Sequence, residues 1–410
     1  MSGAAPFQIV VAGAGVAGLT AALAFASRGF TVQIFERAPE LEEVGAGLQL
    51  SPNATRLLKR IGVLDDLLPV AVAPESVILR DGRTLQELAR VPLGKYAEKR
   101  WGAPYLVAHR ADLQSALLAR IGAEPKIRLT LDAQLRGADN RGRSPTVSVE
   151  TGGRINDVPC EFLVGADGVH SATRKLVSQT HDSNFGREIA WRLTVETGSL
   201  PELGLSDAVS GHAVTAFLRP DFHLIAYPVR AGAAVNLVAF TKAASLPRPG
   251  ASPADGDPAR KGLADELARC APPLRALARN ISAWKHWPIH VADAGLPWTS
   301  ARGVALIGDA AHAMTPYAAQ GAAMAIEDAV TLADAVSAGP DRIGATLATW
   351  ERERRTRIAA VARRAAFNRF AWHAAGPIAL ARNLVLAMRS RESLAADMDW
   401  LYGWKPGATL

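Results

Sequence analysis

The sequence predicts a mixed α/β fold in which a parallel-sheet domain carries an inserted antiparallel sheet and ends in a helical segment. Three observations predict this fold. The first 35 residues run through strand, glycine-rich turn, helix and strand, which is the pattern of a βαβ unit. Residues 185–243 change to short runs typical of an antiparallel sheet, and the C-terminal part is helical and rich in arginine.

Each expected element has a local reason. Residues 7–12 and 31–35 are short apolar strands, and the Ala- and Leu-rich helix between them, residues 16–28, stops at Gly29. The sequence Ser-Pro-Asn at 51–53 is a start signal for a helix over residues 53–68. We expect hairpin strands within 76–91 and 127–150, buried strands at 161–164 and 304–307, and helices at 110–121 and 259–271. The antiparallel strands are expected at 188–196, 214–218, 223–229 and 234–240, followed by a surface loop at 245–258.

Composition excludes several classes of protein. The 410 residues are 49% apolar, which is enough for a large core. The net charge of +7 comes without a long Lys/Arg run, so nucleic acid is not an expected partner. Cys160 and Cys270 lack metal-ligand spacing and no uncharged apolar run reaches about 18 residues, so we expect no metal site, disulfide framework or transmembrane span. We expect a cytoplasmic monomer or homodimer without a signal peptide.

The glycine-rich turn after the first strand predicts a dinucleotide site of the Rossmann type. Gly13 permits the tight turn, Gly15 lets a pyrophosphate approach the backbone, and Gly18 lets the helix pack on the strand. The N-terminus of the helix offers free N–H groups and a positive dipole end to phosphates. Glu36 ends the second strand, where a carboxylate accepts hydrogen bonds from a ribose diol. These residues do not separate NAD from FAD.

Two further stretches run from a short apolar strand into a turn with a glycine and an acid. They are FLVGADGVHSATRK at 162–175 and ALIGDAAHAMTPYAAQGAAMAIEDA at 305–329. With the GxGxxG turn and Glu36 ahead of them, the chain resembles the class A flavoprotein monooxygenases, the single-component FAD-dependent aromatic hydroxylases. The likeness covers nearly the whole chain. It is closest to the group of salicylate hydroxylase, 3-hydroxybenzoate 6-hydroxylase and 6-hydroxynicotinate 3-monooxygenase. The chain has no second GxGxxG turn of comparable quality, as expected for a class that binds NAD(P)H transiently.

The resemblance implies a p-hydroxybenzoate hydroxylase-like fold with FAD as cofactor and NADH or NADPH as a transient electron donor. A Rossmann-type FAD-binding domain is then expected over 1–75, 102–180 and 285–340, an inserted substrate-binding sheet domain over 76–101 and 181–284, and a C-terminal helical segment over 341–410. The residues implied for FAD are Gly13, Gly15, Gly18, Glu36, Arg37, Leu48, Arg110, Asp167, Asp309, Pro316, Gly321 and Ala322. Among them, Asp309 is expected at the ribityl chain and Pro316 near the flavin ring, and Arg174 is a further phosphate candidate.

The resemblance also implies the reaction. NAD(P)H reduces the flavin, O2 forms a flavin C4a-hydroperoxide, and one oxygen atom passes to a small phenolic acid or hydroxypyridine. In the resembled hydroxylases, a His and a Tyr four residues apart line the substrate pocket. Here they are His223, the expected general base, and Tyr227, which is expected to orient the substrate. Gln49 and Gln320 are expected in the same pocket.

Competing interpretations stay open at this point. His223 and Tyr227 are also explained as buried residues of a sheet. Arg192 either binds a substrate carboxylate or is a packing residue. His312 recurs in class members with unrelated substrates, which favours packing beside the flavin over catalysis. The arginines between 352 and 369 are typical of a solvated helix face. The same scaffold also suits a polycyclic, quinolone or alkene substrate. An NAD-dependent dehydrogenase or a non-catalytic flavin-binding protein explains fewer of these features.

Overall fold

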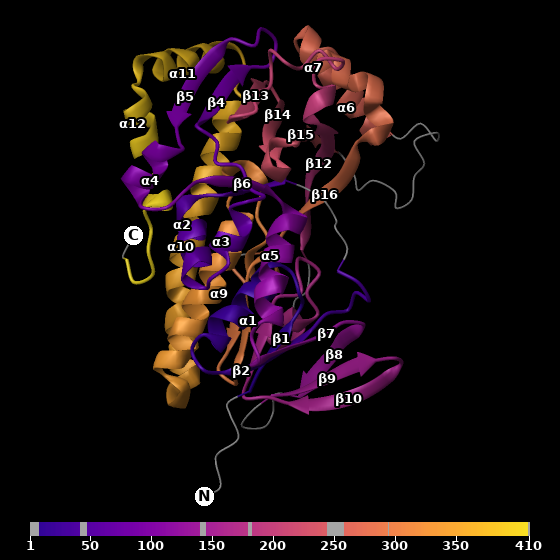
Figure 1. Ribbon diagram of the computed structural model, residues 1–410, viewed down its shortest axis with the longest axis vertical. Helices are drawn as coiled ribbons and strands as arrows, with labels where there is room; N and C mark the ends of the chain where they lie inside the picture. The colour runs from indigo at the N-terminus through magenta and orange to yellow at the C-terminus, as the bar shows by residue number, and fades with distance from the viewer. Residues whose placement is uncertain are drawn as a thin grey trace, which may run out of the picture.

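The structure contains two large sheets, one in the upper and one in the lower part of the view in Figure 1, with long helices beside them. The computed structural model describes residues 8–41, 47–139, 145–178, 183–243, 258–293 and 295–408. The lower sheet has six strands in the order β17-β18-β11-β1-β2-β7. The upper sheet has seven, in the order β16-β12-β15-β14-β13-β4-β5. The mixed α/β class expected from the sequence is confirmed.

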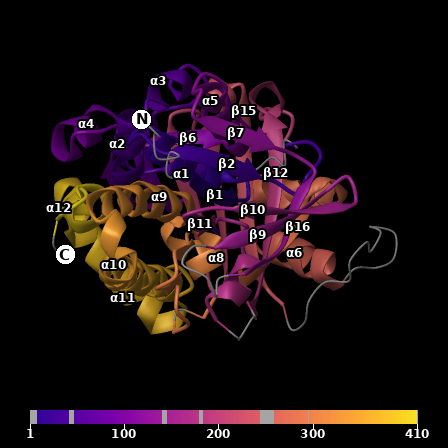
Figure 2. The same ribbon diagram turned by 90° about the horizontal axis from the view of Figure 1, so that it is seen from below.

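The six-stranded sheet brings the three glycine-containing turns together. Strand β1 (Gln8–Ala12) pairs in parallel with β2 (Thr31–Phe35) and with β11 (Phe162–Gly165). Strand β11 pairs in parallel with β18 (Val304–Leu306). Because these strands are parallel, their carboxyl ends meet at one edge of the sheet, and the three turns follow directly from those ends. Helix α1 (Val16–Ala26) lies between this sheet and helix α9 (Gly321–Ala338) (Figure 2).

The seven-stranded sheet separates two apolar clusters. Its strands are β12 (Asn184–Glu196), β13 (Ala213–Arg219), β14 (Phe222–Val229), β15 (Ala234–Lys242), β16 (Lys285–Val291), β4 (Ser76–Asp81) and β5 (Glu87–Pro92). One face, with Ile225, Tyr227 and Phe240, packs into the core shared with the six-stranded sheet. The other face packs with residues of helices α6 (Pro258–Ala268) and α7 (Pro272–Ala276). Because β14 is covered on both faces, all eight of its residues are buried.

The smaller elements complete the chain. Two further sheets contain β3 (Gly47–Leu50) with β6 (Leu106–His109), and β8 (Ala133–Asp139) with β9 (Thr146–Thr151) and β10 (Arg154–Pro159). The remaining strands of the six-stranded sheet are β7 (Ile127–Thr130) and β17 (Thr299–Ser300). The other helices are α2 (Pro52–Arg60), α3 (Leu64–Leu67), α4 (Lys95–Trp101), α5 (Arg110–Gly122), α8 (Asp309–His312), α10 (Ile343–Trp372), α11 (Gly376–Met388), α12 (Arg391–Ala396) and α13 (Asp399–Tyr402). Helix α10 runs along both large sheets (Figure 1).

Several local expectations change in the structure. The helix expected over 53–68 is divided at Gly62, whose φ of +74° takes it out of the helical region. The stretch 127–150 is not a single hairpin, because β7 joins β2 in parallel while β8 pairs with β9. The seven-stranded sheet is mixed rather than purely antiparallel, since β13 and β4 are parallel. The loop expected at 245–258 lies almost entirely outside the described residues.

The division into domains stays a prediction. The pairing of β4 with β13 joins residues 76–81 to the later strands of the seven-stranded sheet. Strand β16, which begins at residue 285, pairs with β12 in that same sheet. Residues 285–291 therefore lie in the sheet that we expected to end at 284.

Candidate active site

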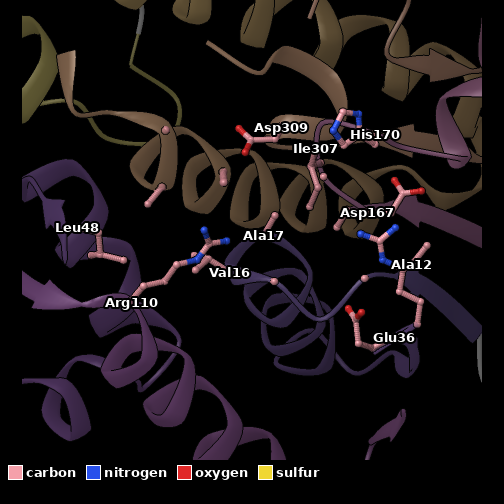
Figure 3. A pocket seen from close by; sticks show the side chains of 18 of the residues that line it. Ala12, Val16, Ala17, Glu36, Leu48, Arg110, Asp167, His170, Ile307 and Asp309 are labelled. Carbon is pink, nitrogen blue, oxygen red and sulfur yellow. The ribbon is translucent and has the colours of Figure 1, made fainter. Parts of the chain in front are cut away.

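A cavity of about 480 Å³ opens at the edge of the six-stranded sheet where the three turns meet (Figure 3). It contains every residue expected at FAD except Gly18. These lining residues are Gly13, Gly15, Glu36, Arg37, Leu48, Arg110, Asp167, Asp309, Pro316, Gly321 and Ala322. The other predicted residues, His223, Tyr227, Gln49 and Gln320, are not part of its lining. The cavity therefore unites segments more than 300 positions apart in the sequence.

In the first turn, the backbone leaves room for a ligand beside Gly15 but not beside Gly13 or Gly18. A Cβ on Gly13 would lie 2.5 Å from the carbonyl oxygen of Ala166, and one on Gly18 would overlap the carbonyl oxygen of Gly13. A Cβ on Gly15 would meet nothing within 4 Å, because it would project into open space. Gly18 thus serves the close packing of helix on strand, and Gly15 gives a phosphate access to the backbone.

Two helix N-termini face this cavity without a side-chain cap. Helix α1 begins after Gly15, and helix α9 begins at Gly321 with Ala322. Neither N-terminus has a side-chain hydrogen bond to its free N–H groups. Such groups need partners, and the helix dipole favours a negative one. The cavity therefore suits a long ligand with negative charge at two separate places, as FAD has at its pyrophosphate and at its reduced ring.

Glu36 is held by the turn that it faces. Its carboxylate accepts a hydrogen bond from the backbone N–H of Ala14 at 2.7 Å and one from that of Ala38 at 3.0 Å. These bonds fix the carboxylate at the end of β2, on the wall of the cavity. The remaining lone pairs of the carboxylate are available to a ribose hydroxyl, so the geometry is compatible with the role expected for Glu36.

The second turn is organised by Asp167, and Arg174 has a different position from the one expected. The Asp167 carboxylate accepts hydrogen bonds from Ser171 and from the N–H and hydroxyl of Thr173. Arg174 is buried, and its guanidinium donates to the carbonyl oxygens of Ala310 (3.0 Å), Val169 (3.2 Å) and Asp309 (3.3 Å). The phosphate role considered for Arg174 is therefore wrong; it ties the second turn to the third.

The third turn is fixed from behind the cavity. Gly308 has φ 58° and ψ −139°, a conformation that L-residues rarely adopt, and its N–H donates to Asp328 at 2.9 Å. His312 is buried, and its Nε2 also contacts the Asp328 carboxylate. His312 does not line the cavity, whereas the exposed carboxylate of Asp309 does. This placement favours the packing interpretation of His312.

A buried charge cluster supports the same turn and corrects the expectation of a solvated face for the arginine-rich stretch. Its members are Glu327, Asp328, Arg354 and Arg357, all less than 4% exposed. Arg354 joins both carboxylates, at 2.8 and 2.7 Å, and Arg357 joins Glu327 at 2.9 Å. The arginine-rich stretch of α10 is thus not simply a solvated face. Burial raises the pKa of Asp328, but attraction to His312 and Arg354 outweighs burial and lowers that pKa below its usual value.

Gln320 belongs to the same buried network, which it joins through Asn53 and Glu327. Its side chain is buried and bonds Ser51, at 3.0 Å, and Asn53, which in turn donates to Glu327 at 2.7 Å. The structure does not place this side chain on the cavity wall, because its amide is taken up by the α2 side of the fold. The position expected for Gln320 in the substrate pocket is therefore not the one observed.

Arg192 is the functional candidate whose role the sequence left open. It lies on β12, lines the cavity, and has its guanidinium 4.7 Å from the centre of the Trp287 ring. Within the described residues it has no carboxylate partner. Burial lowers the pKa of Arg192, while nearby Tyr227 raises it. A guanidinium stays charged in such a place, so it favours an anionic ligand group.

Tyr227 lies near this arginine, and Tyr227 and Gln49 both make contacts that involve strand β3. The ring of Tyr227 is so close to Gly47 that a Cβ there would lie 2.5 Å from it. The N–H of Gly47 donates to Asn236 at 3.1 Å, and burial raises the pKa of Tyr227. Gln49 accepts a hydrogen bond from Tyr105 at 2.6 Å. These contacts position the strand β3 that carries Leu48 along the cavity.

His223 is fully buried behind the cavity wall. Its ring stacks on Phe240 at 4.5 Å and contacts Tyr317, which follows the cavity residue Pro316, at 5.2 Å. Its Nδ1 lies 2.9 Å from Nε2 of His373, at the end of helix α10. Its Nε2 is buried and has no hydrogen-bond partner in the described structure. Burial lowers the pKa of His223 well below its usual value, so the ring is neutral.

The described residues show no cluster of His, Cys, Asp or Glu suited to a metal ion. Nor do they include a helix of the length and apolar character needed to cross a membrane. The residues around the cavity instead fit a flavin dinucleotide, with open backbone at Gly15 and uncapped helices at both ends.

Comparisons with known proteins show the family of this chain. The family described as FAD binding domain matches residues 6–365. A 3-hydroxybenzoate 6-hydroxylase of Polaromonas naphthalenivorans is 31% identical over 99% of this chain and 98% of its own. A 3-amino-4-hydroxybenzoate 2-monooxygenase of Streptomyces cremeus is 33% identical over 98% and 96%. The complex of Klebsiella pneumoniae HpxO with FAD and uric acid shares the fold, with a TM-score of 0.79 at 23% identity over 96% and 95% of the chains. This chain belongs to the class A FAD-dependent aromatic hydroxylases, flavoprotein monooxygenases with a p-hydroxybenzoate hydroxylase-like fold.

Proposed function

We propose that this FAD-dependent monooxygenase hydroxylates a small phenolic acid, with NADH or NADPH as electron donor and O2 as co-substrate. The observation that carries the proposal is Arg192, a partly buried guanidinium without a carboxylate partner in the described structure, on the wall of the FAD cavity. An aromatic carboxylate would supply its missing charge. Both curated relatives above are named for a hydroxybenzoate, which supports the same substrate class.

The residues of the cavity divide the work. Gly15 and the α1 N-terminus would hold the pyrophosphate, Glu36 the ribose, Asp309 the ribityl chain, and the α9 N-terminus the pyrimidine end of the ring. Bound flavin supplies the electron transfer and oxygen activation that side chains do not provide. Pro316 and the buried strand β14 would exclude water from the reacting ring.

The residues that would activate the substrate lie on the seven-stranded sheet. We assign the carboxylate of the substrate to Arg192 and its orientation to Tyr227, which lies next to that arginine. The unpartnered Nε2 of His223 is the atom that would accept the phenolic proton. A phenolate is a better nucleophile than a phenol, so this proton transfer favours attack on the activated oxygen. Because His223 lies behind the cavity wall, the substrate ring would enter between Pro316 and β14 to reach it.

The proposal is tested with a panel of hydroxybenzoates, hydroxypyridines and quinolones. Each compound is scored for stimulated NAD(P)H oxidation and for hydroxylated product by mass spectrometry. We expect hydroxybenzoates to give product and His223→Ala to keep bound FAD while losing most hydroxylation. Product from quinolones alone would replace the proposed substrate class, and full activity in His223→Ala would remove the base assignment.

A further inference from the structure

We propose that His223 and His373 form a two-histidine relay that carries the phenolic proton of the substrate from the interior to the surface at the end of helix α10. The inference rests on the proposed hydroxylation, and it adds His373 to the groups that serve it. The two residues lie 150 positions apart in the sequence, yet Nδ1 of His223 is 2.9 Å from Nε2 of His373. This is the distance of a direct hydrogen bond between rings.

The inner end of the pair has a free position. His223 is 0% exposed, and its Nε2 has no hydrogen-bond partner in the described structure. Buried polar atoms are rarely left without a partner, so this nitrogen has the properties of a binding position for a ligand. Four rings enclose the imidazole: Phe240, Tyr317, Trp372 and His373. With the ring sealed in this way, a proton taken up at Nε2 would need an exit other than bulk water.

The outer end of the pair reaches the protein surface. His373 follows the last residue of α10 and is half-buried. Burial lowers the pKa of His373, and among the nearby charged groups Asp221 raises this pKa whereas Arg369 and Lys242 lower it. Asp221 and Lys242 form an exposed ion pair at 2.7 Å. A proton released from His373 therefore arrives beside a solvated carboxylate.

Glu188 is another charged group near the histidine pair, and it already has partners. Glu188 is buried, accepts a hydrogen bond from Tyr317, and pairs with Arg369 at 3.0 Å. It is therefore not available as a counter-ion for a protonated His223. Burial lowers the pKa of His373 to about 4, and it also lowers that of His223, so neither ring holds a positive charge near neutral pH. A relay avoids the free-energy cost of a buried positive charge, because no imidazolium has to persist.

The transfer balances without any further reagent. The O–H bond of the substrate breaks and its proton bonds to Nε2 of His223. The proton on Nδ1 of His223 passes to Nε2 of His373 across their hydrogen bond, and the proton on Nδ1 of His373 leaves to water or to Asp221. Both rings start and end neutral, with their tautomers exchanged. The same chain in reverse returns a proton to the product oxygen and resets the pair.

The test follows proton release in the FAD-loaded enzyme without NAD(P)H. A pH-indicator dye reports the release by stopped flow when 3-hydroxybenzoate, or the best phenolic acid of the panel, is mixed with the protein. We expect His373→Asn and His373→Gln to slow the release by about tenfold or more. Added imidazole restores it, because a small base can replace the missing outer ring. His212→Asn, at an exposed histidine elsewhere, is the matched control and should match the wild type.

The outcomes separate the relay from the function beneath it. Wild-type rates in both His373 variants overturn the relay, and so does a slow rate that imidazole leaves unchanged in folded, FAD-loaded variants. Hydroxylation by the wild type continues to support the proposed function in either case. A wild type that oxygenates no phenolic acid rejects the proposed function itself. Release that survives His223→Gln removes both the base and the relay.

Discussion

Asp328 of helix α9 accepts the backbone N–H of Gly308 at 2.9 Å, twenty positions earlier in the chain. The same carboxylate binds His312 and, at 2.7 Å, Arg354. The turn that presents Asp309 to the cavity is therefore fixed by groups that do not line the cavity. This arrangement leaves the Asp309 carboxylate exposed on the cavity wall, while its backbone is held by Arg174.

We predict that Asp328→Asn lowers both stability and FAD affinity. The change removes one of the two carboxylates that pair with the buried Arg354. Breaking a buried ion pair costs about 3–5 kcal/mol. Urea unfolding of the FAD-loaded protein measures the first effect, and titration of the apoprotein with FAD measures the second. Glu150→Gln is the control, because it breaks the exposed pair with Arg136 and should change the free energy of unfolding by about 0.5 kcal/mol or less. Equal effects of the two changes would contradict the support role of Asp328.

Gly15→Ala should weaken FAD binding without unfolding the protein. The new methyl group would meet no protein atom within 4 Å, and the φ of −76° at Gly15 suits alanine. It would, however, occupy space in the cavity that a pyrophosphate needs. We expect FAD affinity to fall by about tenfold or more, roughly 1.4 kcal/mol. Gly122→Ala, which also meets no atom but lies outside the cavity, should leave affinity unchanged. Unchanged FAD affinity in Gly15→Ala would place the pyrophosphate elsewhere.

Arg192→Met should raise KM for an acidic substrate far more than for its uncharged amide. The guanidinium contributes through its charge, whereas the methionine keeps much of the packing against Trp287. For a carboxylate we expect KM to rise by about ten- to a hundredfold, equal to a loss of about 1.4–2.7 kcal/mol. Steady-state kinetics with 3-hydroxybenzoate and 3-hydroxybenzamide make the comparison. Equal changes for acid and amide would assign Arg192 to packing alone.

Stability should decline between about pH 6.5 and pH 4. In the folded protein the pKa of His223 is well below 6.5 and that of His373 is about 4, whereas both are near 6.5 in the unfolded chain. The unfolded chain therefore binds more protons in this range, so stability is complete above pH 6.5 and is lost as pH falls. Thermal melts across this range should show the decline, and the double variant His223→Gln/His373→Gln should flatten it. A residual slope is expected from His290, whose pKa burial also lowers. An undiminished slope in the double variant would contradict these assignments.

The sequence predicts well which residues of the three turns gather at the cavity, because the signals for these residues are local. Gly13, Gly15 and Glu36 follow from a turn and the strand beside it, and parallel pairing brings that turn to the other two. For these residues, chain neighbours determine the geometry.

The rest depends on contacts between distant segments, which no local pattern records. The parallel pairing of β4 with β13 joins residues more than 130 positions apart. Arg174 reaches carbonyl oxygens of the third turn, and Arg354 turns inward to two carboxylates on α9, although a run of arginines is more typical of a solvated surface. His373 lies in a helical segment without any recognisable motif, and its contact with His223 exists only after folding.

The most direct test of the central claim is the fate of molecular oxygen in the reaction. The purified protein, loaded with FAD and supplied with NADH, is incubated with 3-hydroxybenzoate and related phenolic acids under ¹⁸O2. We predict a hydroxylated product that carries one ¹⁸O atom per molecule, formed in step with NADH consumption. NADH consumption that yields hydrogen peroxide without labelled product for every phenolic acid would contradict the account.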